Sequence, residues 1–391
     1  MKVSIVGQGY VGLPLAIAAA SAGHEVWGID SNVMLVDELN RGVSRLGDLT
    51  DAQIMQAVNA KRFKATVDFG VINSCDLVVI CVPTPLDSTF EPDFSYVKSA
   101  AESVAENIKE GALVIVESTV SPGTTRGLLK NILDKSDIKY HLAYSPERID
   151  PSNPKWNVTN TPKLVAGISE EATQKAMIFY KSFISEVVPA SSVEVIESAK
   201  LLENSFRLIN ISFINEFAQF CWKMGIDVRE VIQAASTKPY GFMAFYPGVG
   251  VGGHCIPVDP SYLSAKAKEI GASNSFIDLA NKINHSLSSY FTVVANEILG
   301  SLKGKKIIVV GVAYKPDVSD VRETPSLDLI KALRSEGADV SWHDELVKEW
   351  IGEKSAKLSA DYDLAILANP HTGTDLSQLG SVRILDTRGG Y

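Results

Sequence analysis

The chain has 391 residues, of which 46% are hydrophobic and 21% are charged, and its formal net charge is -9. This length predicts two or three domains, and the composition is ordinary for a globular protein. The negative charge argues against nucleic acid as a partner, because phosphate backbones bind basic surfaces. No apolar run is long enough for a membrane span and no signal-peptide pattern is present, so we expect a cytoplasmic protein without a membrane partner.

A βαβ unit is predicted over residues 2–30, with a strand at 2–6 and a second strand that ends at Asp30. The loop between the first strand and the following helix has the pattern G-x-G-x-x-G and reads Gly7-Gln8-Gly9-Tyr10-Val11-Gly12. In this context the pattern predicts a dinucleotide site, because the glycines admit the pyrophosphate to the helix N-terminus. Asp30 would accept hydrogen bonds from the adenosine ribose and repel a 2′-phosphate, which favours NAD over NADP.

Three further strands are predicted in the first domain, at 77–82, 112–116 and 140–144, and a polar segment follows each of them. Ligands of doubly wound sheets bind at the carboxyl ends of strands, so these segments are candidates for cofactor binding or catalysis. The candidate residues there are Pro83, Thr84, Ser118, Thr119 and Glu147. Ordinary turn chemistry is the alternative, since Ser, Thr and Pro are common in such loops.

A long helix without Pro or Gly is predicted from about Ser192 to Met224. Lys200, Asn204 and Arg207 lie on one of its faces, because spacings of four and three residues coincide on a helix. Since the neighbouring residues are strongly apolar, we expect this helix to be buried and its basic residues to need a partner, such as the hydroxyls and phosphates of a substrate. A solvated polar stripe is the alternative. A second helix, at about 275–302, would pack nearby.

Cys255 is the most distinctive candidate for chemistry. It follows Gly252, Gly253 and His254, and Asp259 lies four positions later. Glycines allow a close approach to the backbone, so a substrate can reach a thiol placed in this way. A small buried cysteine in a tight turn is the alternative. Cys75, Cys81 and Cys221 fall in apolar or helical runs where we expect core positions. The four cysteines have neither a disulfide pattern nor zinc-site spacing, and no metal is expected.

A second α/β unit is predicted from Lys305 onward. It lacks the full glycine fingerprint, so a second NAD is not expected. The loop after its first strand carries Tyr314, Lys315 and Arg322, and the basic side chains of Lys315 and Arg322 can meet an anion; ordinary surface charge is the alternative. The strands of this unit are expected at 306–310, 339–342 and 364–368.

These pieces, in this order, resemble the UDP-glucose/GDP-mannose dehydrogenase family, the nucleotide-sugar 6-dehydrogenases, over essentially the whole chain. The matching motifs are Gly7–Pro14, Val82–Pro85, Glu117–Thr119, Ser145–Arg148, Lys200–Asn204, Gly252–Cys255 with Asp259, and Tyr314-Lys315 with Arg322. The resemblance implies an α/β protein with two Rossmann-like doubly wound domains joined by a central all-helical domain with a long helix. The expected domains are residues 1–190 for NAD, 191–302 for the helices and 303–391 for the UDP-sugar.

The resemblance further implies that a C6 hydroxyl is oxidised to a carboxylate while two NAD are reduced. Cys255 would attack the intermediate aldehyde, and the resulting thiohemiacetal would be oxidised to a thioester that water hydrolyses. Lys200 and Asp259 would hold a water that takes the first proton. The implied catalytic set is Thr119, Glu147, Lys200, Asn204, Cys255 and Asp259.

The resemblance also implies two binding sets. For NAD these are Gly7, Gly9, Tyr10, Val11, Gly12, Asp30, Pro83, Thr84, Ser118, Thr119 and Arg322. For the UDP-sugar they are Arg148, Ile149, Lys200, Asn204, Arg207, Tyr246, Gly252, Tyr314 and Lys315. Two positions depart from some members of the family: Pro151 replaces a second glutamate, and Ser31 rather than lysine follows Asp30.

Residues 252–260 are similar to the branch of the family that acts on UDP-N-acetylhexosamines, and residues 237–248 are similar to enzymes that oxidise UDP-N-acetylglucosamine. UDP-N-acetylmannosamine enzymes usually have an Arg-containing segment there, which this chain lacks. UDP-N-acetylmannosamine, UDP-N-acetylgalactosamine and UDP-glucose are the alternative substrates. The product would serve as a precursor of a surface polysaccharide.

Two other functions compete with this hypothesis. A two-electron hydroxyacid dehydrogenase shares the NAD domain and a helical Lys–Asn pair but needs no thiol, and a catalytically silent NAD-binding protein needs neither. We also expect a homodimer or higher homo-oligomer, because the apolar content of helices 192–224 and 275–302 exceeds what one face of an amphipathic helix needs.

Overall fold

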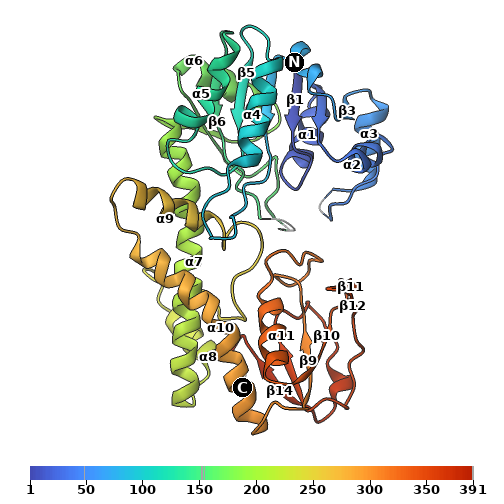
Figure 1. The fold of residues 1–391 in the computed structure, drawn as a ribbon, viewed down its shortest axis with the longest axis vertical. Coiled ribbons are helices and arrows are strands. Elements are labelled where there is room, and N and C mark those ends of the chain that lie inside the picture. The colour runs from blue at the N-terminus through green and yellow to red at the C-terminus, as the bar shows by residue number, and fades with distance from the viewer. Residues whose placement is uncertain (48, 151–152, 154, 390–391) are drawn as a thin grey trace. The chain divides into compact units, whose positions relative to one another are not determined.

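The computed structural model describes residues 1–47, 49–150, 153 and 155–389 (Figure 1). The chain forms two compact units, one of Met1–Leu202 with Lys268–Ile270 and one of Glu203–Ala267 with Gly271–Tyr391. Helix α7 (Val193–Met224) contributes residues to both units. Among the described helices, none is both long and apolar enough to cross a membrane.

The first unit is built on an eight-stranded sheet with the order β3-β2-β1-β4-β5-β6-β7-β8. Strands β1 to β6 are parallel, and their order is that of the Rossmann fold. Strand β7 pairs antiparallel with β6, and β8 pairs parallel with β7. The strands are β1 (Lys2–Val6), β2 (Glu25–Ile29), β3 (Phe63–Thr66), β4 (Leu77–Ile80), β5 (Leu113–Val116), β6 (His141–Tyr144), β7 (Lys163–Gly167) and β8 (Val187–Pro189).

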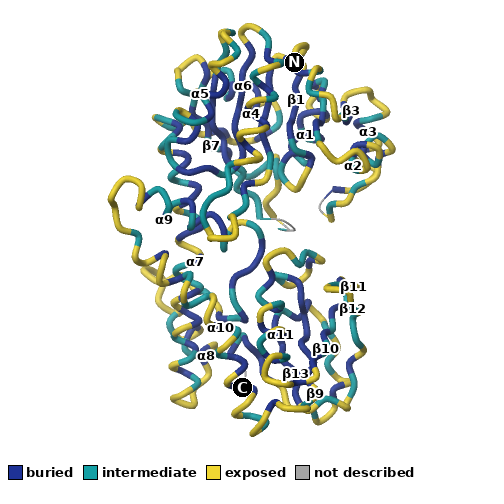
Figure 2. The backbone as a smooth tube through the Cα atoms, viewed as in Figure 1, coloured by how far each residue is buried: buried dark blue, intermediate teal, exposed yellow. Residues whose placement is uncertain are grey.

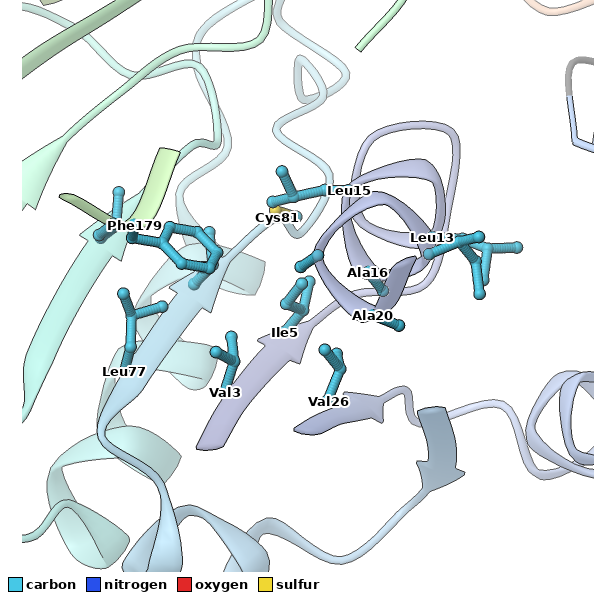
Figure 3. Packing of buried hydrophobic residues seen from close by; sticks show 14 of the residues in the cluster. Val3, Ile5, Leu13, Leu15, Ala16, Ala20, Val26, Leu77, Cys81 and Phe179 are labelled. Carbon is cyan, nitrogen blue, oxygen red and sulfur yellow. The ribbon is translucent and has the colours of Figure 1, made fainter. Parts of the chain in front are cut away.

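Helices cover this sheet because its strands are apolar on both faces. Val3 and Ile5 of β1 pack in one buried cluster with Leu15 of helix α1, as Figure 3 shows, whereas Val6 belongs to a second cluster with helix α4. This alternation follows from the two-residue period of a strand. The helices of this unit before α7 are α1 (Gly12–Ser21), α2 (Val33–Asn40), α3 (Asp51–Asn59), α4 (Ser95–Asn107), α5 (Lys130–Leu133) and α6 (Glu170–Lys181).

The second unit contains a four-stranded parallel sheet with the order β10-β9-β13-β14, together with a two-stranded ladder of β11 and β12. The strands are β9 (Lys306–Val310), β10 (Asp339–His343), β11 (Glu349–Trp350), β12 (Glu353–Lys354), β13 (Leu364–Leu367) and β14 (Arg383–Asp386). Figure 2 shows the larger strands as buried and the loops between them as mostly exposed. The helices after α7 are α8 (Val228–Ser236), α9 (Asp259–Glu269), α10 (Ser275–Leu299) and α11 (Pro325–Ser335).

The predicted fold class is confirmed, including both Rossmann-like sheets and the long helix. The prediction that the long helix is buried holds for one face only. Lys200 and Asn204 are buried, whereas the side chains of Leu202 and Phe206 are exposed. The apolar content of α7 therefore exceeds what packing within a single chain uses.

Gly311, which follows β9, lies in a tightly packed part of the second sheet. Its φ is +80°, and a Cβ there would lie 2.1 Å from the backbone of Asn369. Gly304 has a φ of +72° but no atom within 4 Å of such a Cβ, so it is a matched control.

We expect Gly304→Ala to cost only the left-handed backbone penalty of about 1–2 kcal/mol. Gly311→Ala should cost roughly 1–3 kcal/mol more, because the backbone of Asn369 must move. The thermal midpoints of unfolding of the two variants compare these costs. Equal midpoints would contradict the packing described for β9.

Candidate functional site

The loop after β1 has the shape that a dinucleotide requires. A Cβ at Gly7, where φ is +92°, would lie 2.6 Å from the carbonyl oxygen of Cys81, and a Cβ at Gly12 would lie 1.8 Å from that of Gly7. At Gly9 a Cβ would meet no atom within 4 Å. Gly7 and Gly12 are thus required by the fold, whereas Gly9 leaves the backbone open to a ligand, as in the dinucleotide fingerprint.

Asp30 holds this loop from the end of β2. Its Oδ2 accepts a hydrogen bond from the backbone N–H of Gln8 at 2.8 Å, and its Oδ1 accepts one from Asn32 at 2.9 Å. A carboxylate has about four lone-pair sites, and this one is partly exposed, so it can also accept ribose hydroxyls. The residues of the loop and Asp30 therefore fit NAD.

The polar segments after β4 and β5 lie side by side, as predicted for neighbouring strands. The hydroxyl of Ser118 donates to the carbonyl oxygen of Val82 at 2.7 Å, which joins the two segments. Thr84 and Ser118 are buried, Thr119 is half-buried and Pro83 is exposed. These side chains lie beside the switch point between β1 and β4, where ligands of such sheets bind.

Glu147 belongs to an ion cluster that is largely shielded from water. The ammonium of Lys163, which begins β7, lies 3.0 Å from Oε2 of Glu117 and 3.1 Å from Oε2 of Glu147. The hydroxyl of Tyr180 donates to the other oxygen of Glu117. The exposed fractions of the side chains of Lys163, Glu117 and Glu147 are 5%, 0% and 15%. Water therefore does little to screen these charges, and their mutual attraction is strong.

The cluster sets the protonation of both glutamates. Burial would raise the pKa of Glu147, but Lys163 and the backbone N–H groups of Arg148 and Ile149 outweigh burial and hold that pKa below its ordinary value. Burial also acts on Glu117, and there it raises the pKa in spite of Lys163. Glu147 is thus an oriented carboxylate at neutral pH.

Lys163 is a functional candidate that the sequence analysis did not identify. The available signal was a lysine that opens an apolar strand, Lys163-Leu164-Val165-Ala166-Gly167. A buried lysine needs a carboxylate partner, so its position predicts acidic residues nearby, although the sequence does not say which.

Glu197 fastens helix α7 to the first unit one turn before Lys200. Its carboxylate accepts hydrogen bonds from the backbone N–H groups of Gly123 at 2.6 Å and Thr125 at 2.9 Å, and the residue is fully buried. Burial raises the pKa of Glu197 above its usual value although these N–H groups oppose the shift. Lys200, itself buried, is thereby held in a fixed place relative to the segment after β5.

The second unit brings Cys255, Asn204 and Asp259 together. The amide nitrogen Nδ2 of Asn204 donates to Oδ2 of Asp259 at 2.6 Å, and both residues are buried. The backbone N–H of Asp259, the first residue of α9, donates to the carbonyl oxygen of Cys255 at 2.9 Å. Cys255 is exposed, whereas Cys75, Cys81 and Cys221 are buried, as predicted. Cys255 is therefore the cysteine that a substrate can reach.

The glycines before Cys255 serve a contact within the chain. A Cβ at Gly253, where φ is +83°, would lie 2.8 Å from the ring of Tyr314, and a Cβ at Gly252 would lie 2.7 Å from the carbonyl oxygen of Glu323. The backbone N–H of Gly253 also donates to the carbonyl oxygen of Arg322 at 3.2 Å. In the described structure these glycines therefore allow a close approach to the loop after β9, whereas the sequence analysis expected an approach to a ligand.

Four more of the predicted residues lie as follows. Arg148, in the first unit, donates from Nη1 to the carbonyl oxygen of Pro162 at 3.0 Å. In the second unit, Arg207 and Tyr246 are exposed, and Arg322 forms an ion pair with Asp320 at 2.6 Å. Pro151 lies outside the described residues.

An open dinucleotide loop and an acid at the end of β2 define a Rossmann-type dinucleotide-binding protein. Comparison with known proteins gives the family. Residues 1–184, 194–286 and 308–388 match the NAD binding, central and UDP binding domains of the UDP-glucose/GDP-mannose dehydrogenase family.

Two curated relatives and one solved structure illustrate the similarity. The chain is 32% identical over 380 residues to the UDP-N-acetyl-D-mannosamine dehydrogenase of Pyrococcus horikoshii, covering 95% of this chain and 90% of that protein. It is 33% identical over 385 residues to the UDP-N-acetyl-D-glucosamine 6-dehydrogenase of Pseudomonas aeruginosa, covering 95% and 88%. The structure of the UDP-D-ManNAc dehydrogenase from Pyrococcus horikoshii matches with a TM-score of 0.91 at 31% identity, covering 99% of this chain and 95% of that one.

The chain belongs to the UDP-glucose/GDP-mannose dehydrogenase family. It is an NAD-dependent UDP-sugar 6-dehydrogenase, which confirms the predicted family, enzyme class and cofactor.

The ion cluster gives a pH-dependent stability that a single substitution tests. In Lys163→Met, two buried carboxylates lose their cation at neutral pH, so we expect a loss of about 3–5 kcal/mol in the free energy of unfolding at pH 7. As pH falls, the carboxyl groups take up protons and their charge disappears. The difference from wild type should therefore shrink below about pH 5.

The matched control is Lys130→Met, since Lys130 pairs with Asp134 at the surface. That variant should lose roughly 0.5 kcal/mol or less at any pH. Urea denaturation at several pH values measures both. A pH-independent loss in Lys163→Met would show that lost packing, and not unpaired charge, is the cause.

Proposed function

We propose that this enzyme oxidises the C6 hydroxyl of a UDP-N-acetylhexosamine, with UDP-N-acetylglucosamine as the preferred substrate, to the uronic acid. Two NAD are reduced for each sugar. The observation that supports this most strongly is the exposed thiol of Cys255 beside the buried Asn204–Asp259 pair. A two-electron hydroxyacid dehydrogenase needs no such thiol, and a silent NAD-binding protein needs none of the three residues.

In the proposed reaction, NAD accepts a hydride from C6 in each of the two oxidations when it is bound. Lys200 and Asp259 hold the water that takes the hydroxyl proton in the first oxidation. Sγ of Cys255 then bonds to the aldehyde carbon and gives a thiohemiacetal, which the second oxidation converts into a thioester. Water cleaves the thioester, which releases the acid and restores the thiol.

Asn204 has the orientation that oxyanion stabilisation needs. An amide nitrogen carries two N–H donors, and Asp259 fixes the plane of this amide by accepting one of them. We assign the second N–H, together with Lys200, to the negative oxygen at C6. A donor that is already aligned does not have to reorganise as charge develops, and this makes it effective.

Glu147 and Thr119 complete the proposed catalytic set. Because Lys163 and two backbone N–H groups hold Glu147 ionised, we assign it the orientation of the hydrolytic water by accepting a hydrogen bond from it. A carboxylate with a lowered pKa is a weak proton acceptor. Asp259 is therefore the better candidate to take the proton, and Thr119 helps to position the water.

The remaining binding residues follow from their chemistry. Arg148, Ile149 and Arg207 are assigned to the sugar and the diphosphate. Tyr314 and Lys315 are assigned to the UDP-sugar in the third domain, and Arg322 to the NAD pyrophosphate. The functional parts of the chain are then residues 1–190, 191–302 and 303–391, and we place the enzyme in the cytoplasm, where it makes a precursor of a surface polysaccharide.

The preference for the gluco epimer rests on the segment before the nucleophile. The relatives include enzymes named for both N-acetylmannosamine and N-acetylglucosamine, so they do not separate the epimers. Tyr240 and Tyr246 are exposed and His254 is half-buried, and aromatic side chains of this kind can line a sugar ring. The segment lacks the arginine that is usual in UDP-N-acetylmannosamine enzymes.

A substrate panel tests this proposal. NADH release is measured with UDP-GlcNAc, UDP-ManNAc, UDP-GalNAc and UDP-glucose, each limiting, with excess NAD. We expect two NADH per molecule of UDP-GlcNAc and the highest kcat/KM for that sugar. A higher kcat/KM with UDP-ManNAc would refute the epimer assignment alone. One NADH per sugar would refute the four-electron reaction.

The proposed assembly is a homodimer or higher homo-oligomer built on α7 and α10. One face of α7 exposes large apolar side chains at helical spacing, and α10 exposes others. These residues are Leu202, Phe206, Phe213, Phe220 and Met224 on α7, and Phe276, Leu279 and Val293 on α10. Exposed apolar side chains in such a row favour association, because contact removes them from water.

Light scattering at micromolar concentration tests the assembly. Wild type should have the mass of a dimer or larger species, and Phe213→Glu with Phe220→Glu should lower the mass, because the substitutions place charge in the contact. Val33→Glu with Met34→Glu is a matched control, since these side chains are exposed on α2. A monomeric wild type would contradict the proposed oligomer.

A further inference from the structure

The ends of three strands in the second sheet meet at the carboxylate of Asp344, just after β10. Its Oδ2 accepts from the backbone N–H groups of Val312 at 2.9 Å and Ala313 at 3.3 Å, which follow β9. Its Oδ1 accepts from Leu346 and Val347, both at 2.9 Å. The side chain has an exposed fraction of 0%. Asp344 corresponds in the fold to Asp30 of the first sheet, but its carboxylate serves the chain itself.

His371 connects this carboxylate to the loop after β9. Its Nε2 lies 2.7 Å from Oδ1 of Asp344, and its Nδ1 accepts the backbone N–H of Asp317 at 2.8 Å. A backbone N–H can only donate, so Nδ1 is the acceptor in this bond, and Nε2 is the ring nitrogen that can donate to Asp344. The exposed fraction of the His371 side chain is 6%, so both bonds are shielded from water.

The loop that His371 contacts contains a strained residue. Asp317 has a φ of +64°, a left-handed conformation that is unfavourable for a residue other than glycine. Its carboxylate accepts from the backbone N–H of Thr372 at 2.7 Å and from the Thr372 hydroxyl at 2.6 Å. Asn369 also donates from Nδ2 to the carbonyl oxygen of Ala313 at 3.1 Å. Residues 313–323 are thus fastened to the segment after β13.

The same loop supports the segment of the nucleophile. The ring of Tyr314 packs against Gly253, where an added Cβ would lie 2.8 Å from it, and the carbonyl oxygen of Arg322 accepts the Gly253 N–H at 3.2 Å. Cys255 follows two residues later. A displacement of residues 313–323 would therefore move both Lys315, on the loop, and the thiol.

We propose that His371 is a positioning residue of this enzyme. By accepting the N–H of Asp317 it fixes residues 313–323, and through them it sets the UDP-binding side chains and the position of the Cys255 thiol. The link to the thiol rests on the function proposed above, whereas the link to UDP rests only on the UDP binding domain of the family. Two expectations follow, one for UDP affinity and one for the second oxidation.

Two variants separate the bonds that His371 makes. In His371→Asn the amide oxygen can replace Nδ1 as the acceptor for Asp317, whereas in His371→Gln the amide nitrogen can replace Nε2 as the donor to Asp344. Only His371→Asn therefore keeps the hydrogen bond with Asp317 in the loop 313–323. His343→Gln is the control, because His343 lies in the same sheet and its ring contacts the carbonyl oxygen of Ala356 at 2.7 Å.

The first measurement is calorimetric titration of each full-length protein with UDP. His371→Gln should weaken UDP binding about threefold to tenfold, the range expected for one lost hydrogen bond. His371→Asn and His343→Gln should stay close to wild type. Thr372→Val removes the exposed hydroxyl that donates to Asp317, so it should also lower the affinity for UDP. This variant serves as the readout if His371→Gln does not fold. Unchanged UDP affinity in whichever of these two variants folds would overturn the proposal.

The second measurement is single-turnover NADH release with UDP-GlcNAc, or with the best sugar of the substrate panel. In His371→Gln the NADH release of the second oxidation should slow more than that of the first, because only the second oxidation needs the thiol of Cys255. A loss of folded protein alone would reduce both amplitudes and leave the two rate constants unchanged, which would overturn the link to Cys255. One NADH from wild type would refute the four-electron function, and with it the link to the thiol, whereas the UDP titration would still decide the link between His371 and the loop.

Discussion

The hydrogen bond between Asn204 and Asp259 is the constraint on which the proposed catalytic site depends. It joins the long helix α7 to the first residue of α9, and the backbone of that same residue holds the carbonyl oxygen of Cys255. Both side chains are buried, so leaving either partner unpaired would cost about 1–3 kcal/mol or more. This cost keeps the amide of Asn204, the carboxylate of Asp259 and the backbone of Cys255 in one arrangement.

Buried charged side chains hold several candidate functional side chains in place. Lys163 orients Glu147, and Glu197 anchors the turn of α7 that precedes Lys200. The carboxylate of Asp344 binds groups near the ends of three strands. Buried charges are expensive unless they are paired or hydrogen-bonded, and each of these has such partners. Such groups contribute little net stability, but they oppose the alternative arrangements in which they would lose a partner. That property keeps each of the neighbouring side chains in one orientation.

The sequence predicted well wherever a local pattern carries a physical requirement. The glycine loop with Asp30, the long helix and the accessible cysteine were all visible, because backbone geometry, helical spacing and motif order are local properties. Lys163, Glu197 and His371 were missed, because each acts through partners far away along the chain, such as Glu117, Gly123 and Asp317. The apolar excess of α7 was visible too, but the sequence did not show which of its residues are exposed, since periodicity does not distinguish an apolar face that packs within the chain from one that is left exposed.

The central claim is that Cys255 carries the substrate as a covalent intermediate. Its most direct test is mass spectrometry of the full-length enzyme quenched in acid during turnover with NAD and UDP-GlcNAc, or the best sugar of the panel, followed by peptide mapping. The account predicts an adduct with the mass of the uronyl nucleotide on the peptide that contains Cys255, and its absence without NAD. In Cys255→Ser, oxidation should stop at the aldehyde, because a serine hydroxyl is a much weaker nucleophile at neutral pH. Full uronate production by Cys255→Ser, with no adduct on the wild-type peptide, would contradict the account.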